Sequence, residues 1–430
     1  MQILYNAVLV IAAIFILPYY LITMVFKGKY RKSLIPKLGG KQAKILAGLK
    51  DGPRVWIHAV SVGEVTAAAP IVAALKLKKP DIKVIFSTST ETGQEMARRH
   101  IFGADAFIYF PLDIPYVVRK IIKSAKPSVF VMIETELWPN FLKACKAQGI
   151  KTLIVNGRIS LRSYSKYRWT NFFWKKILND LSAAAMISEI DASRLKKIGM
   201  SPEKIQVMGN AKYDALASTA SSGLREEISR RLSTQKDDRF FVAGSTHPGE
   251  EEIIIRVYAE ILALYPEFKL IIVPRHIERT SSIIELLQKN GFTDIITMTE
   301  INNSKARTSE RVIVVDVIGE LFKIYSLATI VYCGGSLVNR GGQNILEAAA
   351  WGKIIFYGPS MEDFSEEKTL LEEAGCGVTV RNAKDLLRKI IQALEKPAEL
   401  EKRGARGKVV VAANMGAAVR YAEIISRLID

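Results

Sequence analysis

The chain has 430 residues, of which 49% are hydrophobic and 24% are charged. These values are typical of a folded protein with two or three domains, and they exclude a disordered chain or a fibre. Its three cysteines and four histidines are scattered without metal-ligand spacing. We therefore expect no disulfide framework, no metal site and a reducing compartment.

The net charge of +18 is concentrated in two stretches that contain no acidic residue. Residues 1–50 carry eight Lys and Arg side chains, and residues 137–179 carry nine. Positive charge gathered in this way indicates an anionic partner, and nucleic acid and an anionic membrane are the two candidates.

The first 26 residues favour the membrane over nucleic acid. No charged residue lies between Ile3 and Phe26, and about 20 apolar residues suffice to cross a bilayer. Basic residues follow the apolar run instead of preceding it, unlike a cleaved signal peptide. We predict a membrane anchor over residues 1–26, a basic juxtamembrane segment over 27–50, and a cytoplasmic location for the rest. A helix lying in the membrane interface and a buried core helix are the alternatives.

Beyond the anchor, short β-branched runs alternate with helical patterns, which predicts parallel sheets covered by helices. The small and polar segment 215–236 is predicted to link two such domains, 51–214 and 237–405, and its sequence allows one short helix within the linker. The C-terminal residues 406–430 are predicted to form a helix that packs back on the first domain. The predicted strands are 54–59, 83–87, 106–110, 128–133, 151–155, 183–187, 239–243, 269–273, 311–315, 329–333 and 353–357.

The predicted fold class is therefore α/β, with two Rossmann-like doubly wound domains that face a cleft. Ligands of such sheets bind at the carboxyl ends of the strands, so the loops there are candidate sites. In the first domain, Ser61 and Glu64 form either a helix capping box or the setting of a general base. After strand 128–133, Glu134 and Glu136 point to the same face, where they are either functional or ion-paired.

Residues 162–176 interleave six aromatic side chains with basic ones. This composition suits a surface at the level of lipid headgroups, and an amphipathic helix packed on the core is the alternative.

The second domain contains a glycine-rich turn, residues 334–344, between a predicted strand and a helix. The backbone amides of this turn would favour the binding of a phosphate group. The turn is neither a Walker loop nor a dinucleotide-binding fingerprint. Arg275 offers a guanidinium suited to phosphate, and Glu347 could accept hydrogen bonds from ribose hydroxyls. The loops together indicate a nucleotide site, with ordinary tight-turn chemistry as the alternative.

Seven motifs occur in order behind the apolar segment, namely WIHAVSVGE, ETELWPN, NGRIS, GNAKYD, PRHIER, DVIGEL and GGSLVNRGGQNILEAAA. Together they resemble the motifs of the bacterial 3-deoxy-D-manno-octulosonic acid (Kdo) transferases. The resemblance implies a GT-B glycosyltransferase that moves Kdo from CMP-Kdo to a lipid A precursor (lipid IVA), with inversion, in lipopolysaccharide synthesis at the inner membrane. It implies no metal and no cofactor besides the donor substrate.

The same resemblance places the catalytic base on Glu64 and the residues that stabilise the transition state on Glu134 and Lys212. Its implied CMP contacts are Pro274, Arg275, Ile318, Gly319, Glu320, Asn344, Ile345, Leu346 and Glu347. The chain departs from the family pattern at Gln343, Ala348, Ser360 and Asp363.

Two other functions compete with this one. Another membrane-attached GT-B enzyme with a UDP-sugar donor would fit the fold and the anchor. A non-enzymatic protein that binds a membrane or nucleic acid would explain the charge alone.

Overall fold

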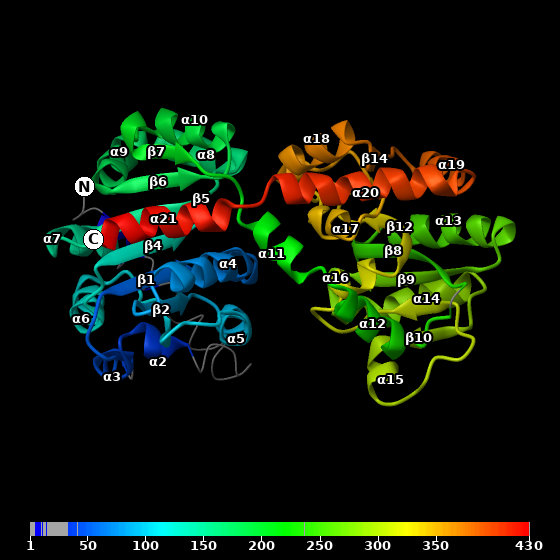
Figure 1. Cartoon of the computed structure of the whole chain (residues 1–430), viewed down its shortest axis with the longest axis horizontal. Helices are drawn as coiled ribbons and strands as arrows, with labels where there is room; N and C mark the ends of the chain where they lie inside the picture. The colour runs from blue at the N-terminus through cyan, green and yellow to red at the C-terminus, as the bar shows by residue number, and fades with distance from the viewer. Residues whose placement is uncertain are drawn as a thin grey trace. The chain divides into compact units, whose positions relative to one another are not determined.

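The computed structural model describes residues 5–9, 11, 14, 33–40, 42–235 and 237–429. They form two compact units (Figure 1). The first unit extends to Ala215 and includes the chain again from Asn414, and the second comprises Leu216–Ala413. Over the described residues, each unit contains one parallel sheet of seven strands, covered by helices.

In the first unit, the chain enters the sheet at an interior strand, β1. The strand order is β3-β2-β1-β4-β5-β6-β7, so the chain builds one side of β1 first and then returns to build the other. The strands are β1 (Arg54–Ala59), β2 (Lys83–Thr88), β3 (Ala106–Tyr109), β4 (Val129–Ile133), β5 (Lys151–Gly157), β6 (Ala183–Met186) and β7 (Ile205–Val207).

Apolar side chains cover both faces of this sheet. Every residue of β1 and β4 is buried, as expected for central parallel strands. On one face, the rings of Trp56 and Phe141 pack edge to face, with their centroids 5.0 Å apart. The helices are α2 (Leu34–Lys37), α3 (Gln42–Ala47), α4 (Val62–Lys78), α5 (Glu91–His100), α6 (Pro115–Ala125), α7 (Pro139–Ala147), α8 (Leu161–Trp169), α9 (Asn171–Asp180), α10 (Glu189–Ile198), α11 (Lys212–Thr219) and α21 (Ala417–Ile429).

The second unit repeats this plan with the order β10-β11-β9-β8-β12-β13-β14. Its strands are β8 (Arg239–Thr246), β9 (Phe268–Pro274), β10 (Ile295–Thr297), β11 (Val312–Val314), β12 (Ala328–Cys333), β13 (Ile355–Tyr357) and β14 (Gly377–Thr379). Its helices are α12 (Ser222–Arg231), α13 (Glu251–Leu264), α14 (Thr280–Lys289), α15 (Met298–Asn302), α16 (Leu321–Tyr325), α17 (Leu346–Ala350), α18 (Ser365–Glu373), α19 (Ala383–Leu394) and α20 (Pro397–Ala413).

Every strand predicted from the sequence is present, and three further strands were not predicted. Those three, β7, β10 and β14, have three residues each and lie at sheet edges. An edge strand is half exposed and therefore needs no continuous apolar run. Its sequence resembles that of a loop for this reason.

The segment predicted as a linker, residues 215–236, contains the one short helix that its sequence allowed, α12, and this helix packs on the second unit. Ile228 and Leu232 are fully buried, and Arg231 pairs with Glu320 at 3.0 Å. Arg307 donates to the Leu232 carbonyl at 2.8 Å. Only one narrow face of α12 is apolar, so its sequence lacks the usual helical pattern although the segment packs on the second unit.

The C-terminal helix α21 completes the first unit. It packs on α4, and its residues Tyr421 and Ile425 are fully buried in the same core cluster as the α4 side chains. Asp214 caps its start by accepting hydrogen bonds from Gly416 N at 2.7 Å and Ala418 N at 3.4 Å. The return to this unit begins at Asn414, compared with the predicted boundary at residue 406.

Most of the predicted anchor, residues 1–26, lies outside the described residues. Residues 5–9, 11 and 14 are helical. Tyr5 donates a hydrogen bond to Asp113 at 2.9 Å, and Asn140 donates one to Asn6 at 2.7 Å. Among the described residues, only Pro397–Ile429 is long and apolar enough to cross a membrane, and it is 44% buried inside the protein. The anchor at residues 1–26 thus stays a prediction.

We expect Ile425→Ala to lower the free energy of unfolding by about 2–5 kcal/mol, because it leaves a cavity between α21 and α4. Val419→Ala on the exposed face of α21 should change it by less than about 0.5 kcal/mol. Urea unfolding of both variants in detergent solution measures the difference. Equal effects would show that α21 does not belong to this core.

Candidate active site

The candidate catalytic residues lie at the carboxyl edge of the first sheet. Strands β1 and β4 are neighbours, but the chain leaves them toward opposite sides of the sheet. Loops diverge at such a switch point and leave a crevice that commonly binds ligands. Glu64 follows β1, and Glu134 follows β4 directly.

Glu64 helps to cap the start of α4, and the pKa of its carboxyl group is raised. Its carboxylate accepts hydrogen bonds from Val60 N at 2.7 Å and from the Ser61 hydroxyl at 2.9 Å, and its own amide donates to Ser61 Oγ at 3.4 Å. Burial raises the pKa of Glu64 to about 7, and the nearby Glu134 charge adds to the rise. A carboxyl group that is half ionised near neutral pH can take up a proton during a reaction.

Glu134 stands in a left-handed backbone conformation, with φ of 61°. Such a conformation is uncommon for a residue with a side chain and marks a constrained position. Lys212 at the start of α11 pairs with Glu134 at 3.5 Å. Asn156, which accepts a hydrogen bond from Ala211 N at 2.9 Å, holds the segment that carries this lysine.

Glu136 extends the acidic cluster beyond the three predicted residues. Burial raises its pKa to about 7, with further contributions from the charges of Glu64 and Glu134. The structure therefore brings Glu64, Glu134 and Lys212 together as expected from the motifs, and Glu136, which the sequence placed on the same face as Glu134, lies with them. The sequence signal for Glu136 was its position two residues after Glu134 at the end of a strand.

The second unit has its own switch point between β8 and β12. Arg275 follows β9, the other neighbour of β8, and its amide donates to the Thr246 carbonyl at 3.0 Å. Asn344 donates to Glu347 at 3.1 Å at the start of α17. Burial raises the pKa of Glu347 to about 7 against the opposing effects of the Asn344 hydrogen bond and the Arg275 charge.

The other predicted nucleotide contacts lie in the same unit. Pro274 ends β9, whereas Ile345 and Leu346 are buried, so only their backbone can face a ligand. Ile318 and Gly319 follow β11, the strand beside β9, and the Ile318 side chain is 85% exposed. Glu320 is already paired with Arg231 and Lys323.

The glycine-rich turn binds an internal carboxylate where the sequence predicted a phosphate. Glu250 is completely buried and accepts hydrogen bonds from five donors. The donors are the amides of His247, Gly335, Ser336 and Leu337 and the hydroxyl of Tyr332, at 2.7–3.0 Å. These amides are therefore not free for a ligand, and the prediction is wrong for this part of the turn.

A family model described as 3-deoxy-D-manno-octulosonic-acid transferase matches residues 31–215. The protein named 3-deoxy-D-manno-octulosonic acid transferase from Haemophilus influenzae is 32% identical over 99% of this chain and 98% of its own length. The chain belongs to the Kdo transferase family. It is therefore a glycosyltransferase.

Further relatives agree with this membership. The Kdo transferase of Chlamydophila psittaci is 29% identical over 94% of this chain and 91% of its own length. UDP-GlcNAc 2-epimerase from Neisseria meningitidis superimposes with a TM-score of 0.61 at 15% identity, over 87% of this chain and 99% of the epimerase. A glycosyltransferase from Rickettsia africae superimposes with a TM-score of 0.56 at 15% identity, over 88% of this chain and 98% of that glycosyltransferase. These two solved structures show that the fold is of the GT-B kind.

The positions that depart from the Kdo transferase pattern support the glycine-rich turn. Ser360 accepts a hydrogen bond from Gly341 N at 3.0 Å and donates to Glu362 at 2.8 Å. Asp363 packs against Gly341, and Ala348 is fully buried in α17. Gln343 packs beside Gly335. Their structural contacts keep the turn in shape.

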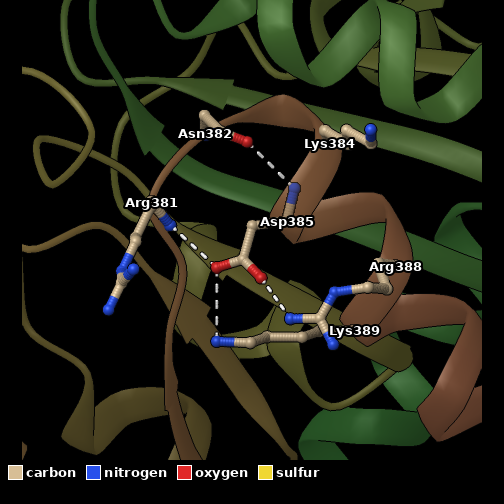
Figure 2. Close-up of a pocket in the computed structure, with 6 residues that line it drawn as sticks. All are labelled: Arg381, Asn382, Lys384, Asp385, Arg388 and Lys389. Carbon is tan, nitrogen blue, oxygen red and sulfur yellow. Dashed lines mark hydrogen bonds and ion pairs between the residues drawn. The ribbon is translucent and has the colours of Figure 1, made fainter.

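A hollow of about 470 Å³ lies elsewhere, at the start of α19 (Figure 2). Arg381, Lys384, Arg388 and Lys389 make it basic, but Asp385 already pairs with Arg388 at 2.6 Å and Lys389 at 3.3 Å. We assign no ligand to it, because it contains none of the family motifs. Among the described residues, no group of three or more His, Cys, Asp and Glu side chains could hold a metal ion.

Replacement of Glu250 by alanine should lower the free energy of unfolding by at least about 3 kcal/mol, because buried amides lose their acceptor. Glu252→Ala, an exposed change on α13, should cost less than about 1 kcal/mol. Thermal and urea unfolding compare the two variants. A loss for Glu250→Ala no larger than for Glu252→Ala would contradict the role given to Glu250.

Proposed function

We propose that this enzyme transfers Kdo from CMP-Kdo to a lipid A precursor such as lipid IVA, with inversion and release of CMP. The observation that carries the proposal is the Glu64 carboxyl group, whose pKa of about 7 and position beside the Glu134–Lys212 pair suit a general base. Membership of the Kdo transferase family supports Kdo as the transferred sugar, and the position of Glu64 supports general-base catalysis.

The proposed reaction is a single displacement. Glu64 accepts the proton of a primary hydroxyl on the acceptor while that oxygen attacks the anomeric carbon of Kdo. The bond between this carbon and the phosphate oxygen of CMP breaks, and the electron pair leaves with CMP. The Lys212 ammonium, held by Glu134, stabilises negative charge as it develops.

The proposed donor site uses the residues at the carboxyl edge of the second sheet. Arg275 would bind the phosphate through charge-assisted hydrogen bonds. The exposed Ile318 side chain, with Gly319 and Glu320, would face the base, and Glu347 would accept hydrogen bonds from the ribose. The proposal assigns no metal and no cofactor to these steps.

Glu64→Gln tests the base directly. Glutamine keeps an acceptor for Val60 N and a polar partner for Ser61, so the fold should persist while transfer falls about 10²–10⁴-fold. The wild-type rate should rise with pH through about 7, because Glu64 acts only when deprotonated, and it should be lost below that pH. Release of CMP measured across pH gives both results. A near-normal rate for Glu64→Gln would remove Glu64 from the mechanism.

The proposed membrane surface joins the N-terminal anchor to helices α8 and α9. Trp169 is 86% exposed and Phe172 is 67% exposed, with basic residues beside them in both helices. Tyr5 of the N-terminal helix contacts Phe173 of α9 with ring centroids 6.0 Å apart. Exposed aromatic and basic side chains suit the headgroup region of an anionic membrane, where the acylated acceptor lies. We place the enzyme at the inner membrane, with its two units in the cytoplasm.

Trp169→Ala should raise the KM for the lipid acceptor about 10-fold, because the aromatic contact with lipid is lost. The KM for CMP-Kdo should be unchanged. Phe102→Ala, which removes another exposed aromatic ring of the same unit, is the matched control and should leave both values unchanged. Equal effects of the two variants would count against a membrane surface at α8 and α9.

A further inference from the structure

His247 stands at the switch point of the second sheet and has no role in the scheme above. It follows β8 directly, and β8 lies between β9 and β12. Arg275 comes directly after β9, and β12 leads into the glycine-rich turn. The carboxyl ends of adjacent parallel strands meet at one edge, where ligands of such sheets bind. His247 is thus placed between the two segments that the donor proposal uses.

The imidazole of His247 is buried, and one of its two nitrogen atoms has no hydrogen-bond partner. The residue is only 8% exposed, and its Nε2 atom is buried without a hydrogen-bond partner. A Cβ atom on Gly335 would lie 3.3 Å from His247 Cδ2 and 3.4 Å from Nε2, so the ring lies directly on this glycine. Buried polar atoms rarely stay unpaired in a working protein, and an unpaired one near a binding crevice points to a ligand.

The charges that face His247 are mostly positive. Burial lowers the pKa of His247, the Glu250 charge opposes this, and the charges of His276, Arg340 and Arg275 lower it further. The His276 ring lies 5.9 Å from the His247 ring, edge to face. Glu250 is the one carboxylate among these groups, and its oxygens are occupied by five donors. An anionic oxygen is therefore the partner that this environment fits.

We infer that His247 is a donor-binding residue whose Nε2 atom donates a hydrogen bond to an anionic oxygen of the nucleotide sugar. The inference rests on the proposed CMP-Kdo donor. That donor has two anionic groups, the phosphate and the sugar carboxylate, and either oxygen has the required chemistry. Arg275 from the neighbouring strand contributes to the same anionic site.

Two substitutions distinguish this role from a purely structural one. In His247→Gln, the side-chain amide can reach the position of Nε2, whereas in His247→Asn it is too short. Hydrogen bonds to charged groups are strong, so His247→Asn should bind the anion about 10–100-fold more weakly. His247→Gln should retain most of the affinity. His100→Asn, an exposed change in the first unit, is the matched control.

Calorimetric titration of each full-length variant with CMP and with CMP-Kdo measures the effect, and circular dichroism checks folding. If His247→Asn binds CMP and CMP-Kdo equally more weakly than the wild type, His247 Nε2 donates to the phosphate. If only the affinity for CMP-Kdo falls, Nε2 donates to the sugar carboxylate. Wild-type affinity of His247→Asn for both ligands overturns the inference while the donor proposal stands. If folded wild-type enzyme binds neither ligand, the donor proposal fails and the inference fails with it.

Discussion

A buried carboxylate stands near the start of the helix that follows the first strand of each unit, and the number of hydrogen-bond donors that face it decides what it can do. Glu250 precedes α13 and receives five hydrogen bonds. Glu64 lies in the first turn of α4, where its side chain accepts hydrogen bonds from Val60 N and the Ser61 hydroxyl. Glu250 holds the glycine-rich turn through its hydrogen bonds, whereas burial raises the pKa of Glu64 to about 7. Burial without full compensation is what makes Glu64 suitable for proton transfer.

The strand order explains why both carboxylates lie where ligands can bind. Each sheet begins with an interior strand, β1 or β8, and the chain then fills the two sides of the sheet in turn. The helix that follows this strand therefore starts beside a switch point. In the first unit this brings Glu64 toward Glu134, Glu136 and Lys212, and in the second it brings Glu250 and His247 toward the glycine-rich turn.

Much of the fold could be predicted because its central strands are buried on both faces. Such strands are continuous apolar runs, and polar residues at their carboxyl ends mark the candidate sites, as Glu64, Glu134 and Arg275 do. Edge strands such as β7 escaped prediction because only part of their surface is buried. For the same reason the sequence indicates the polar helix α12 only as an option within a linker. Glu250 escaped because a glutamate before a helix is common, and its five donors come mainly from a turn some 85 residues later. The chemical identity of the sugar came from the ordered motifs and from family membership, since local patterns carry no such information.

Transfer of Kdo to lipid is the central claim, and the products test it most directly. Purified enzyme would be incubated with CMP-Kdo and a tetraacylated, bisphosphorylated lipid A precursor, and the lipid would be analysed by mass spectrometry. The account predicts that the lipid gains mass in whole Kdo residues, and that added CMP inhibits this reaction while UDP does not. An unchanged lipid mass with folded enzyme, or a gain that appears only with a UDP-sugar, would contradict it.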